Sequence, residues 1–306
     1  MTEQEQIINP EQPICDAHHH LWDRPGDRYL VEEFLRETIG GHNIVKSVFV
    51  GCKTMYRQDG PPEMSPVGET EFIERITAPT RTGKTKVAAG IVGTADLTLG
   101  AAVAPVLEAH IAAGKGRFRG IRVIGNWKVN PKWREGFNYL EKYGLSFDAF
   151  NTGTLSEVAE LARTFPDTTI ILNHIGGVLP IGPFAPDHER MVAEWRRGIE
   201  ELSSCPNAVI KFGGLGMRTF GFGWAERETK PDSIEMAKIV KPYFMDCVEN
   251  FGADRCLFES NFPPDRVSYS YTVLWNAFKR ITKDFSPDEQ AALFCSNAAR
   301  VYRLGD

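Results

Sequence analysis

Short apolar or β-branched runs recur along the chain, and each is followed by a longer stretch with the periodicity of an amphipathic helix. We expect eight strands, at residues 13–20, 45–50, 86–92, 118–124, 145–150, 168–174, 208–213 and 255–261. Eight alternations of strand and helix predict an α/β fold, a single-domain (β/α)8 TIM barrel over residues 13–306 that follows an N-terminal extension at 1–12. A doubly wound sheet gives the same local alternation, but the count of eight favours the barrel.

Two of the expected helices have recognisable starts. Thr154 with Glu157, and Ser286 with Glu289, match the capping box, in which a hydroxyl and a carboxylate satisfy free amides at a helix start. Pro287 then occupies a first helical position, where its missing N–H costs nothing. These signals predict helices that begin at 155 and 287.

Composition narrows the class of partner. The 306 residues are 42% hydrophobic, carry a net charge of −5 and contain no block of Lys and Arg, so neither nucleic acid nor a membrane is expected as a partner. A small molecule is the expected partner, and nothing in the sequence excludes a homo-oligomer. Without a signal peptide, a membrane span or paired cysteines, we expect a cytoplasmic protein whose six cysteines are reduced.

The most informative run is Asp16-Ala-His-His-His20, after the apolar Pro13-Ile-Cys15. Side chains alternate faces along a strand, so His18 and His20 are expected to project together while His19 points the other way. Two convergent neutral imidazoles suit a divalent metal, or one ligand and one acid or base. A solvated turn or a tag remnant is disfavoured, because Asp16 and the apolar Leu21-Trp22 flank the run.

Polar residues also mark the ends of other predicted strands, and in a barrel these ends meet at one mouth. They are Arg122, Asp148, His174, Lys211, Glu259 and Asn261. This number of polar side chains at one face predicts a site. The long segments 51–68 and 214–232 are expected to wall its pocket, and His42, His110 and His188 are expected at the surface.

From its first strand to its last, the chain resembles the amidohydrolase superfamily, within it the family-2 branch of lactone hydrolases such as L-fuconolactone hydrolase and pyrone-dicarboxylate lactonase. The resemblance rests on six motifs: Asp16-Ala-His-His-His-Leu-Trp22, Gly90-Ile-Val with Asp96-Leu97, Arg119-Gly-Ile-Arg122, Asn173-His-Ile-Gly-Gly177, Lys211-Phe-Gly-Gly-Leu215 and Glu259-Ser-Asn-Phe-Pro263. It implies a barrel with His18, His20 and His174 in the site and hydrolysis by activated water. Such histidines commonly bind zinc or manganese in the superfamily, whereas some lactone hydrolases of the branch work without metal.

The chain departs from the family pattern at the end of the eighth strand, where Asn261 occupies the position of an Asp that serves as general base and often as metal ligand. A carboxamide cannot take a proton from water near neutral pH. Glu259, two residues earlier on the expected inward face, is one replacement. It would otherwise neutralise Lys211 or Arg122 inside the barrel. Asp148 and Asp265 are further candidates.

The resulting hypothesis is attack of water on the carbonyl of a small anionic lactone. His18, His20, His174, Glu259 and Asn261 form the expected catalytic group. Arg122, Lys211, Asp148 and Trp22 are the expected substrate-binding residues, with Arg122 gripping a carboxylate. One zinc or manganese ion would be held by His18, His20, His174 and Glu259; without metal, the histidines and Lys211 would donate hydrogen bonds to the carbonyl. A metal-dependent non-oxidative decarboxylase and a non-catalytic ligand-binding protein are the alternatives.

Overall fold

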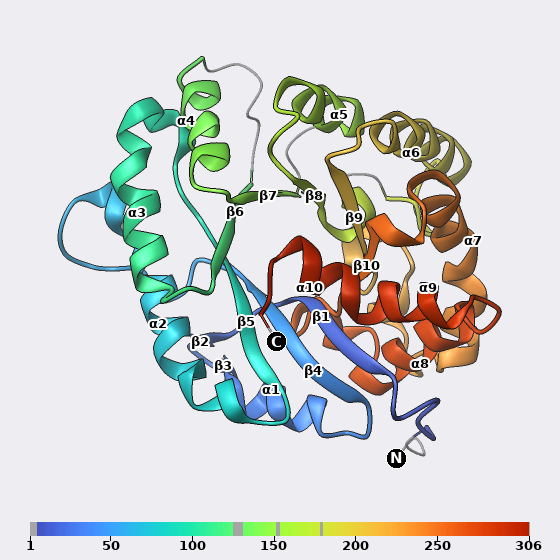
Figure 1. Cartoon of the computed structure of the whole chain (residues 1–306). Coiled ribbons are helices and arrows are strands. Elements are labelled where there is room, and N and C mark those ends of the chain that lie inside the picture. The colour runs from blue at the N-terminus through green and yellow to red at the C-terminus, as the bar shows by residue number, and fades with distance from the viewer. Residues whose placement is uncertain (1–4, 125–130, 151–153, 178–179, 306) are drawn as a thin grey trace.

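The computed structural model describes residues 5–124, 131–150, 154–177 and 180–305, and it contains the predicted (β/α)8 barrel (Figure 1). Its eight parallel strands pair with one another in chain order. They are β1 (Pro13–His19), β4 (Asn43–Val50), β5 (Lys86–Gly93), β6 (Phe118–Ile124), β7 (Ser146–Phe150), β8 (Ile170–Leu172), β9 (Ala208–Phe212) and β10 (Cys256–Phe258). Each predicted strand is therefore present, although β8 and β10 are shorter than expected.

The barrel closes between β1 and the segment that follows β10. The backbone N–H of Asn261 donates to the carbonyl of His18 at 2.9 Å, and the N–H of His20 donates to the carbonyl of Phe262 at 2.8 Å. The Asp16 carboxylate adds a side-chain bond by accepting the N–H of Ser260 at 2.8 Å. These bonds form a polar seam that joins the first strand of the barrel to the last.

Helices cover the outer face of the sheet, except that the one nearest the C-terminus lies across one end of the barrel (Figure 1). They are α1 (Val31–Thr38), α2 (Val67–Thr77), α3 (Ala104–Ala113), α4 (Pro131–Lys142), α5 (Leu155–Thr164), α6 (His188–Ser203), α7 (Ser233–Phe251), α8 (Tyr271–Ile281), α9 (Pro287–Ala291) and α10 (Asn297–Val301). Both predicted capping boxes are formed, at Thr154 and at Ser286, and Pro287 is the first residue of α9. The two helix starts are confirmed.

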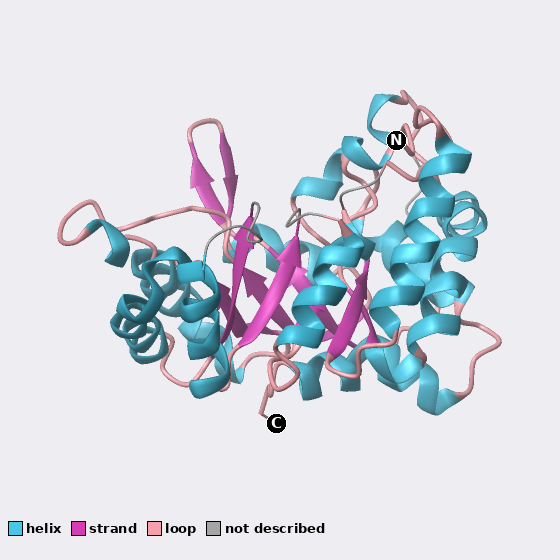
Figure 2. Cartoon of the chain, turned by 90° about the horizontal axis from the view of Figure 1, so that it is seen from above, coloured by secondary structure: helices cyan, strands magenta, loops and turns pink. Residues whose placement is uncertain are grey.

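A two-stranded hairpin, β2 (Trp22–Arg24) with β3 (Asp27–Tyr29), was not expected from the sequence. It projects from the end of the barrel toward which the strand arrows point, while the C-terminal segment lies at the opposite end (Figure 2). Three-residue strands give too little alternation to be recognised by pattern. The hairpin brings Trp22 to the mouth of the barrel.

The floor of the barrel is apolar. Small and β-branched side chains such as Cys15, Ala17 and Val48 pack there, and Tyr302 and Leu304 from the C-terminal segment close it. Above this layer the inward side chains become polar. The barrel interior thus separates a packed floor from a polar mouth.

A bulge in β1 decides which residues reach the mouth. Asp16 pairs with Ser47 and His19 with Phe49, so β1 has one more residue than β4 between these two pairs. Cys15 and Ala17 face the barrel interior, and without the bulge His19 would follow them inward. The extra residue reverses the alternation, so that His18 and His20 face the mouth instead.

The prediction that three histidines lie at the surface is wrong for His42 and His110. His42 is buried against Lys279, whose Nζ lies 2.9 Å from its Nδ1. His110 is fully buried between Thr70 and the carbonyl of Thr94, because its face of α3 packs onto the sheet. His188 begins α6 and is partly exposed.

The six cysteines are free thiols. Of the helices formed by the described residues, none is both long and apolar enough to cross a lipid bilayer.

Candidate active site

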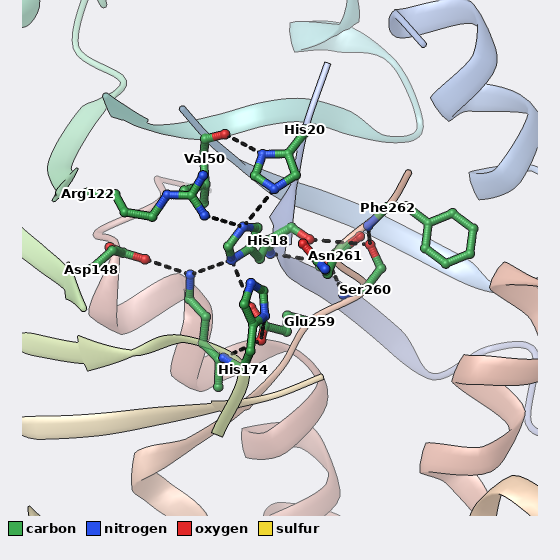
Figure 3. Close-up of polar contacts among 12 residues, drawn as sticks. His18, His20, Val50, Arg122, Asp148, His174, Glu259, Ser260, Asn261 and Phe262 are labelled. Atoms are coloured by element: carbon green, nitrogen blue, oxygen red, sulfur yellow. Dashed lines mark hydrogen bonds and ion pairs between the residues drawn. The ribbon is translucent and has the colours of Figure 1, made fainter. Parts of the chain in front are cut away.

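Three imidazoles meet at the mouth of the barrel (Figure 3). His18 and His20 follow the bulge of β1, and their ring centroids are 4.8 Å apart. His174 stands just beyond β8, in the turn Asn173–Gly176, and its ring centroid is 4.5 Å from that of His18. A left-handed backbone, with φ of 53° at His174, turns this side chain toward His18. The structure thus brings together the three predicted histidines.

His19 points away from this cluster. Its ring stacks on Phe34 at 4.1 Å, and its Nε2 lies 2.9 Å from the hydroxyl of Ser47. These partners lie on the outer side of β1, as the alternation of side chains predicts for the residue between His18 and His20.

The carboxylate of Glu259 lies between His18 and His174. Its Oε1 accepts the backbone N–H of His174 at 2.9 Å and lies 2.6 Å from His174 Nδ1, while its Oε2 lies 2.9 Å from His18 Nδ1. The ion pairs that the sequence suggested, with Lys211 or Arg122, are not its contacts. Glu259, the residue directly after β10, therefore contacts His18 and His174.

The backbone fixes the proton of His20. The carbonyl oxygen of Val50 lies 2.7 Å from His20 Nδ1 and can only accept a hydrogen bond, so Nδ1 carries the proton and Nε2 has a free lone pair. Burial, together with nearby cations, holds the pKa of both His18 and His20 well below the ordinary value. Both rings are therefore neutral at pH 7, with their Nε2 atoms 3.2 Å apart.

A buried ion pair lies next to His18. Lys211 Nζ donates to Asp148 Oδ1 at 2.7 Å and lies 3.5 Å from His18 Nδ1. The hydroxyl of Tyr302, rising from the floor, donates to the same oxygen of Asp148 at 2.8 Å. Asp148 and Lys211 are fully buried, and neither lines the cavity described next. Their contact with substrate stays a prediction, and in the structure each has its partners within the barrel.

A cavity of about 680 Å³ opens beside the histidines. His20, Trp22 and Arg122 line it, and the segment 51–68 supplies a wall that includes Gly51 and Tyr56, as expected. Trp22 is held by a hydrogen bond from its Nε1 to Asp27 at 3.0 Å. The described residues of 214–232 do not line this cavity, although Lys230 to Asp232 line a second cavity together with Phe262.

Arg122 is a buried, positively charged residue in the wall of the cavity. Its Nη2 donates to the carbonyl of Gly51, its Nη1 lies 3.4 Å from His18 Nε2, and its guanidinium lies over the ring of Phe150. One edge of the guanidinium is thus used to hold the side chain in place. The group lies where an anionic substrate in the cavity would meet it.

Asn261 does not share an inward face with Glu259, contrary to expectation. Strand β10 ends at Phe258, and Asn261 has a left-handed backbone with φ of 53°, so the alternation of faces does not continue. Its carboxamide donates to Asp265 at 2.8 Å. Asp265 also accepts bonds from Gly216 and Tyr269, and burial raises its pKa to about 7. Both residues therefore belong to a buried network that holds the loop after β10.

The donor set fits one divalent cation. Ligand atoms of His18, His174 and Glu259 lie within 4.8 Å of one another, and Glu259 Oε2 accepts no hydrogen bond from the described residues. Two imidazoles and a carboxylate are typical zinc donors. Arg122 and Lys211, at 3.4 and 3.5 Å from the ring nitrogens of His18, oppose further positive charge. These two cations favour one ion over two.

Two side chains that contact this region were not singled out from the sequence. Tyr302 reaches Asp148 through the barrel floor, and Glu69 on α2 supports the cavity wall from behind. Neither has a local signal, because each lies on an ordinary helical or C-terminal pattern and meets its partner only in the folded chain.

The sequence profile described as Amidohydrolase matches residues 15–304. The protein y4mH of Sinorhizobium fredii is 33% identical, with 95% of this chain and 98% of the relative aligned. A Burkholderia ambifaria protein named L-fucono-1,5-lactonase is 25% identical, with 94% of this chain and 95% of the relative aligned.

Solved structures show the same fold. An amidohydrolase from Burkholderia multivorans with bound zinc has a TM-score of 0.74 and 20% identity, covering 95% of this chain and 99% of the other. A 5-carboxyvanillate decarboxylase from Novosphingobium aromaticivorans, complexed with manganese, has a TM-score of 0.58 and 11% identity, covering 96% of this chain and 97% of the other.

Proposed function

The chain belongs to the amidohydrolase family of hydrolases, and from that premise we propose that it hydrolyses small lactones that carry a carboxylate. The near full-length similarity to a relative named L-fucono-1,5-lactonase supports a lactone as the substrate. The cavity of about 680 Å³, with Arg122 in its wall, supports a small anionic molecule. Arg122 would bind the carboxylate through its guanidinium.

The observation that carries this proposal is a row of polar groups from the cavity into the barrel. His20 lines the cavity, its Nε2 lies 3.2 Å from His18 Nε2, and His18 Nδ1 lies 2.9 Å from Glu259 Oε2. Neutral imidazoles can accept a proton from a water molecule in the cavity. A carboxylate at the inner end of the row stabilises the positive charge that then develops on the rings.

The mechanism assigns a separate task to each group. His20 Nε2 takes one proton of the attacking water, and His18 Nε2, 3.2 Å away, can share it, while the water oxygen forms a bond to the lactone carbonyl carbon. When the bond between that carbon and the ring oxygen breaks, the imidazole returns the proton to the ring oxygen, which leaves as a hydroxyl group. Glu259 Oε1 holds the ring of His174 through its Nδ1, and Oε2, 2.9 Å from His18 Nδ1, stabilises positive charge on that ring. Glu259 therefore supplies the carboxylate that Asn261 cannot, and it acts through the histidines.

His18, His174 and Glu259, with His20 beside them, are the residues that would hold a single zinc or manganese ion. The chemistry that such an ion supplies is a lower pKa for the attacking water. The contacts of His174 with Glu259 and of His20 with the Val50 carbonyl would also keep these rings oriented as metal ligands.

Acid release from a panel of γ- and δ-lactone carboxylates, measured at constant pH with purified protein, tests the proposal. Turnover of at least one member, lost in His20→Ala, is the expected result. Turnover that survives the loss of His20 would contradict the proposed base. Binding of the panel without turnover would instead favour a non-catalytic protein.

The decarboxylase alternative is tested by the same preparation. One structural neighbour is a manganese-bound 5-carboxyvanillate decarboxylase, although a likeness at 11% identity shows the fold alone. Release of CO2 from aromatic carboxylic acids, with no acid released from any lactone, would replace the lactonase proposal by a decarboxylase.

A further inference from the structure

A buried glutamate supports the wall of the cavity from behind. Glu69 lies in the first turn of α2 and is only 1% exposed. Its Oε1 accepts the backbone N–H groups of Cys52 and Thr54, both at 2.9 Å. One carboxylate oxygen therefore pins two backbone groups of the loop that follows β4.

The pinned loop in turn holds two cations of the cavity. The carbonyl of Gly51 accepts from Arg122 Nη2, and the carbonyl of Cys52 accepts from Arg24 Nη2 at 3.0 Å. The Gly51 carbonyl and the Cys52 N–H belong to the same peptide group. Glu69 and Arg122 thus bind opposite ends of one peptide plane, an arrangement in which each hydrogen bond strengthens the other.

The approach of Glu69 depends on the glycine at position 51. A Cβ atom there would lie 2.7 Å from Glu69 Oε2 and 3.2 Å from the hydroxyl oxygen of Thr94. Oε2 accepts no hydrogen bond from the described residues. Burial lowers the pKa of Arg122, and Glu69 is among the groups whose charge opposes that effect. Burial also raises the pKa of Glu69, so the hydrogen bonds of its Oε1 to the loop, rather than its charge, are what hold Arg122 in place.

We propose that Glu69 is a positioning residue that holds Arg122, through the Gly51–Cys52 peptide, in place to bind the substrate carboxylate. The inference rests on the proposed function and adds to it the residue that sets the preference for anionic over neutral lactones. A residue that merely stabilises the fold would affect both kinds of substrate alike.

The experiment compares each lactone carboxylate with its own methyl ester, using the pair that the wild-type protein hydrolyses best. In Glu69→Ala we expect kcat/KM for the carboxylate to fall about 10- to 100-fold, the worth of a hydrogen bond to a charged group, mainly through KM. The ester should change by less than about 3-fold. Glu69→Gln keeps an oxygen for both N–H groups, so it should restore most of the preference.

Glu74→Ala is the matched control. Glu74 lies on the same helix, is 5% exposed and pairs with Arg81, Lys115 and Arg117 away from the cavity. Its loss should lower thermal stability and leave the ratio of carboxylate to ester unchanged.

Gly51→Ala tests the same contact without removing the carboxylate. Gly51 does not have a left-handed backbone, so alanine is allowed there, and its Cβ would displace Glu69 Oε2. We expect the same loss of preference for the carboxylate, which keeps the inference testable if Glu69→Ala does not fold.

Equal losses for carboxylate and ester in Glu69→Ala or Gly51→Ala would overturn the inference while leaving the lactonase proposal intact. A wild-type protein that hydrolyses both members of every pair equally well would contradict the role of Arg122 and, with it, this inference. If wild-type protein hydrolyses no lactone at all, the proposed function itself fails.

Discussion

The carboxylate of Glu259 lies 2.9 Å from Nδ1 of His18, and both side chains are fully buried. The other ring nitrogen of His18 faces His20, which lines the cavity. The carboxamide of Asn261 is bonded to Asp265, and among the described residues Glu259 is the acid that contacts the imidazole rings of both His18 and His174. Its negative charge should therefore decide the activity of the site.

Glu259→Gln should lower kcat by about 10²- to 10⁴-fold, the usual contribution of acid–base catalysis. The substitution keeps the shape of the side chain but removes the charge that stabilises protonated histidine. Turnover of a lactone carboxylate, measured beside thermal unfolding, checks this result. A stable Glu259→Gln protein with unchanged turnover would exclude Glu259 from the mechanism.

Asn261→Asp is the complementary change. In the Glu259→Gln background it restores a carboxylate two residues later, but on a side chain that points to Asp265. We expect little recovery of activity and a crowded pair of acids whose pKa values separate. Recovery to near the wild-type rate would show that the position of the carboxylate matters less than its presence.

The donor set of His18, His174 and Glu259 should bind one divalent ion per chain at most. Arg122 and Lys211 lie at 3.4 and 3.5 Å from the ring nitrogens of His18, and their charge disfavours a second ion. Elemental analysis of protein prepared without chelator measures the stoichiometry, with His174→Ala as the variant that should bind less. Two ions per chain would contradict this reading of the charges.

Lys211→Met should destabilise the fold by about 3–5 kcal/mol, because it leaves Asp148 as an uncompensated buried charge. Replacing both partners, as in Lys211→Met with Asp148→Leu, should recover much of that loss. Denaturant unfolding of the two single variants and the double variant measures the coupling. Strictly additive losses would show that the ion pair contributes no coupling.

The buried histidine His110, which contacts the carbonyl of Thr94 behind the cavity wall, should make stability depend on pH. Burial lowers its pKa from 6.5 to about 4, so the unfolded chain binds the proton first and stability falls as pH drops from 6.5 toward 4. The contribution of this residue is about 3 kcal/mol. In urea unfolding at several pH values, the free energy of unfolding of His110→Gln should depend less on pH than that of the wild-type protein.

The sequence predicts the parts of the fold that depend on local pattern. The alternation of apolar runs gives each strand, and the hydroxyl–glutamate pairs at Thr154 and Ser286 give two helix starts. The spacing of His18 and His20 gives their common direction because the two residues stay in phase after the bulge. These features depend on neighbours within a few positions in the chain.

Features set by distant contacts were not predictable. Asn261 is the last residue of the predicted eighth strand. In the structure its backbone is left-handed, at the seam between β1 and the loop after β10. His110 has a helical pattern that does not reveal which face packs on the sheet. The sequence around Glu69 indicates only an acidic residue on a helix, because its contact with the loop after β4 forms only when α2 packs behind that loop.

The polar seam between Asp16 and Ser260 joins residues 244 positions apart. Because closing so long a stretch of chain is costly in entropy, we expect these contacts to form late in folding. Among the described residues, two of the four hydrogen bonds across this junction are made by the side chains of Asp16 and Ser260 rather than by the backbone, so we expect the barrel to open first here. Parting there would separate His18 from Glu259 while the other strand pairs stay intact. On mild heating, catalytic activity should therefore be lost at a lower temperature than the far-UV circular dichroism signal.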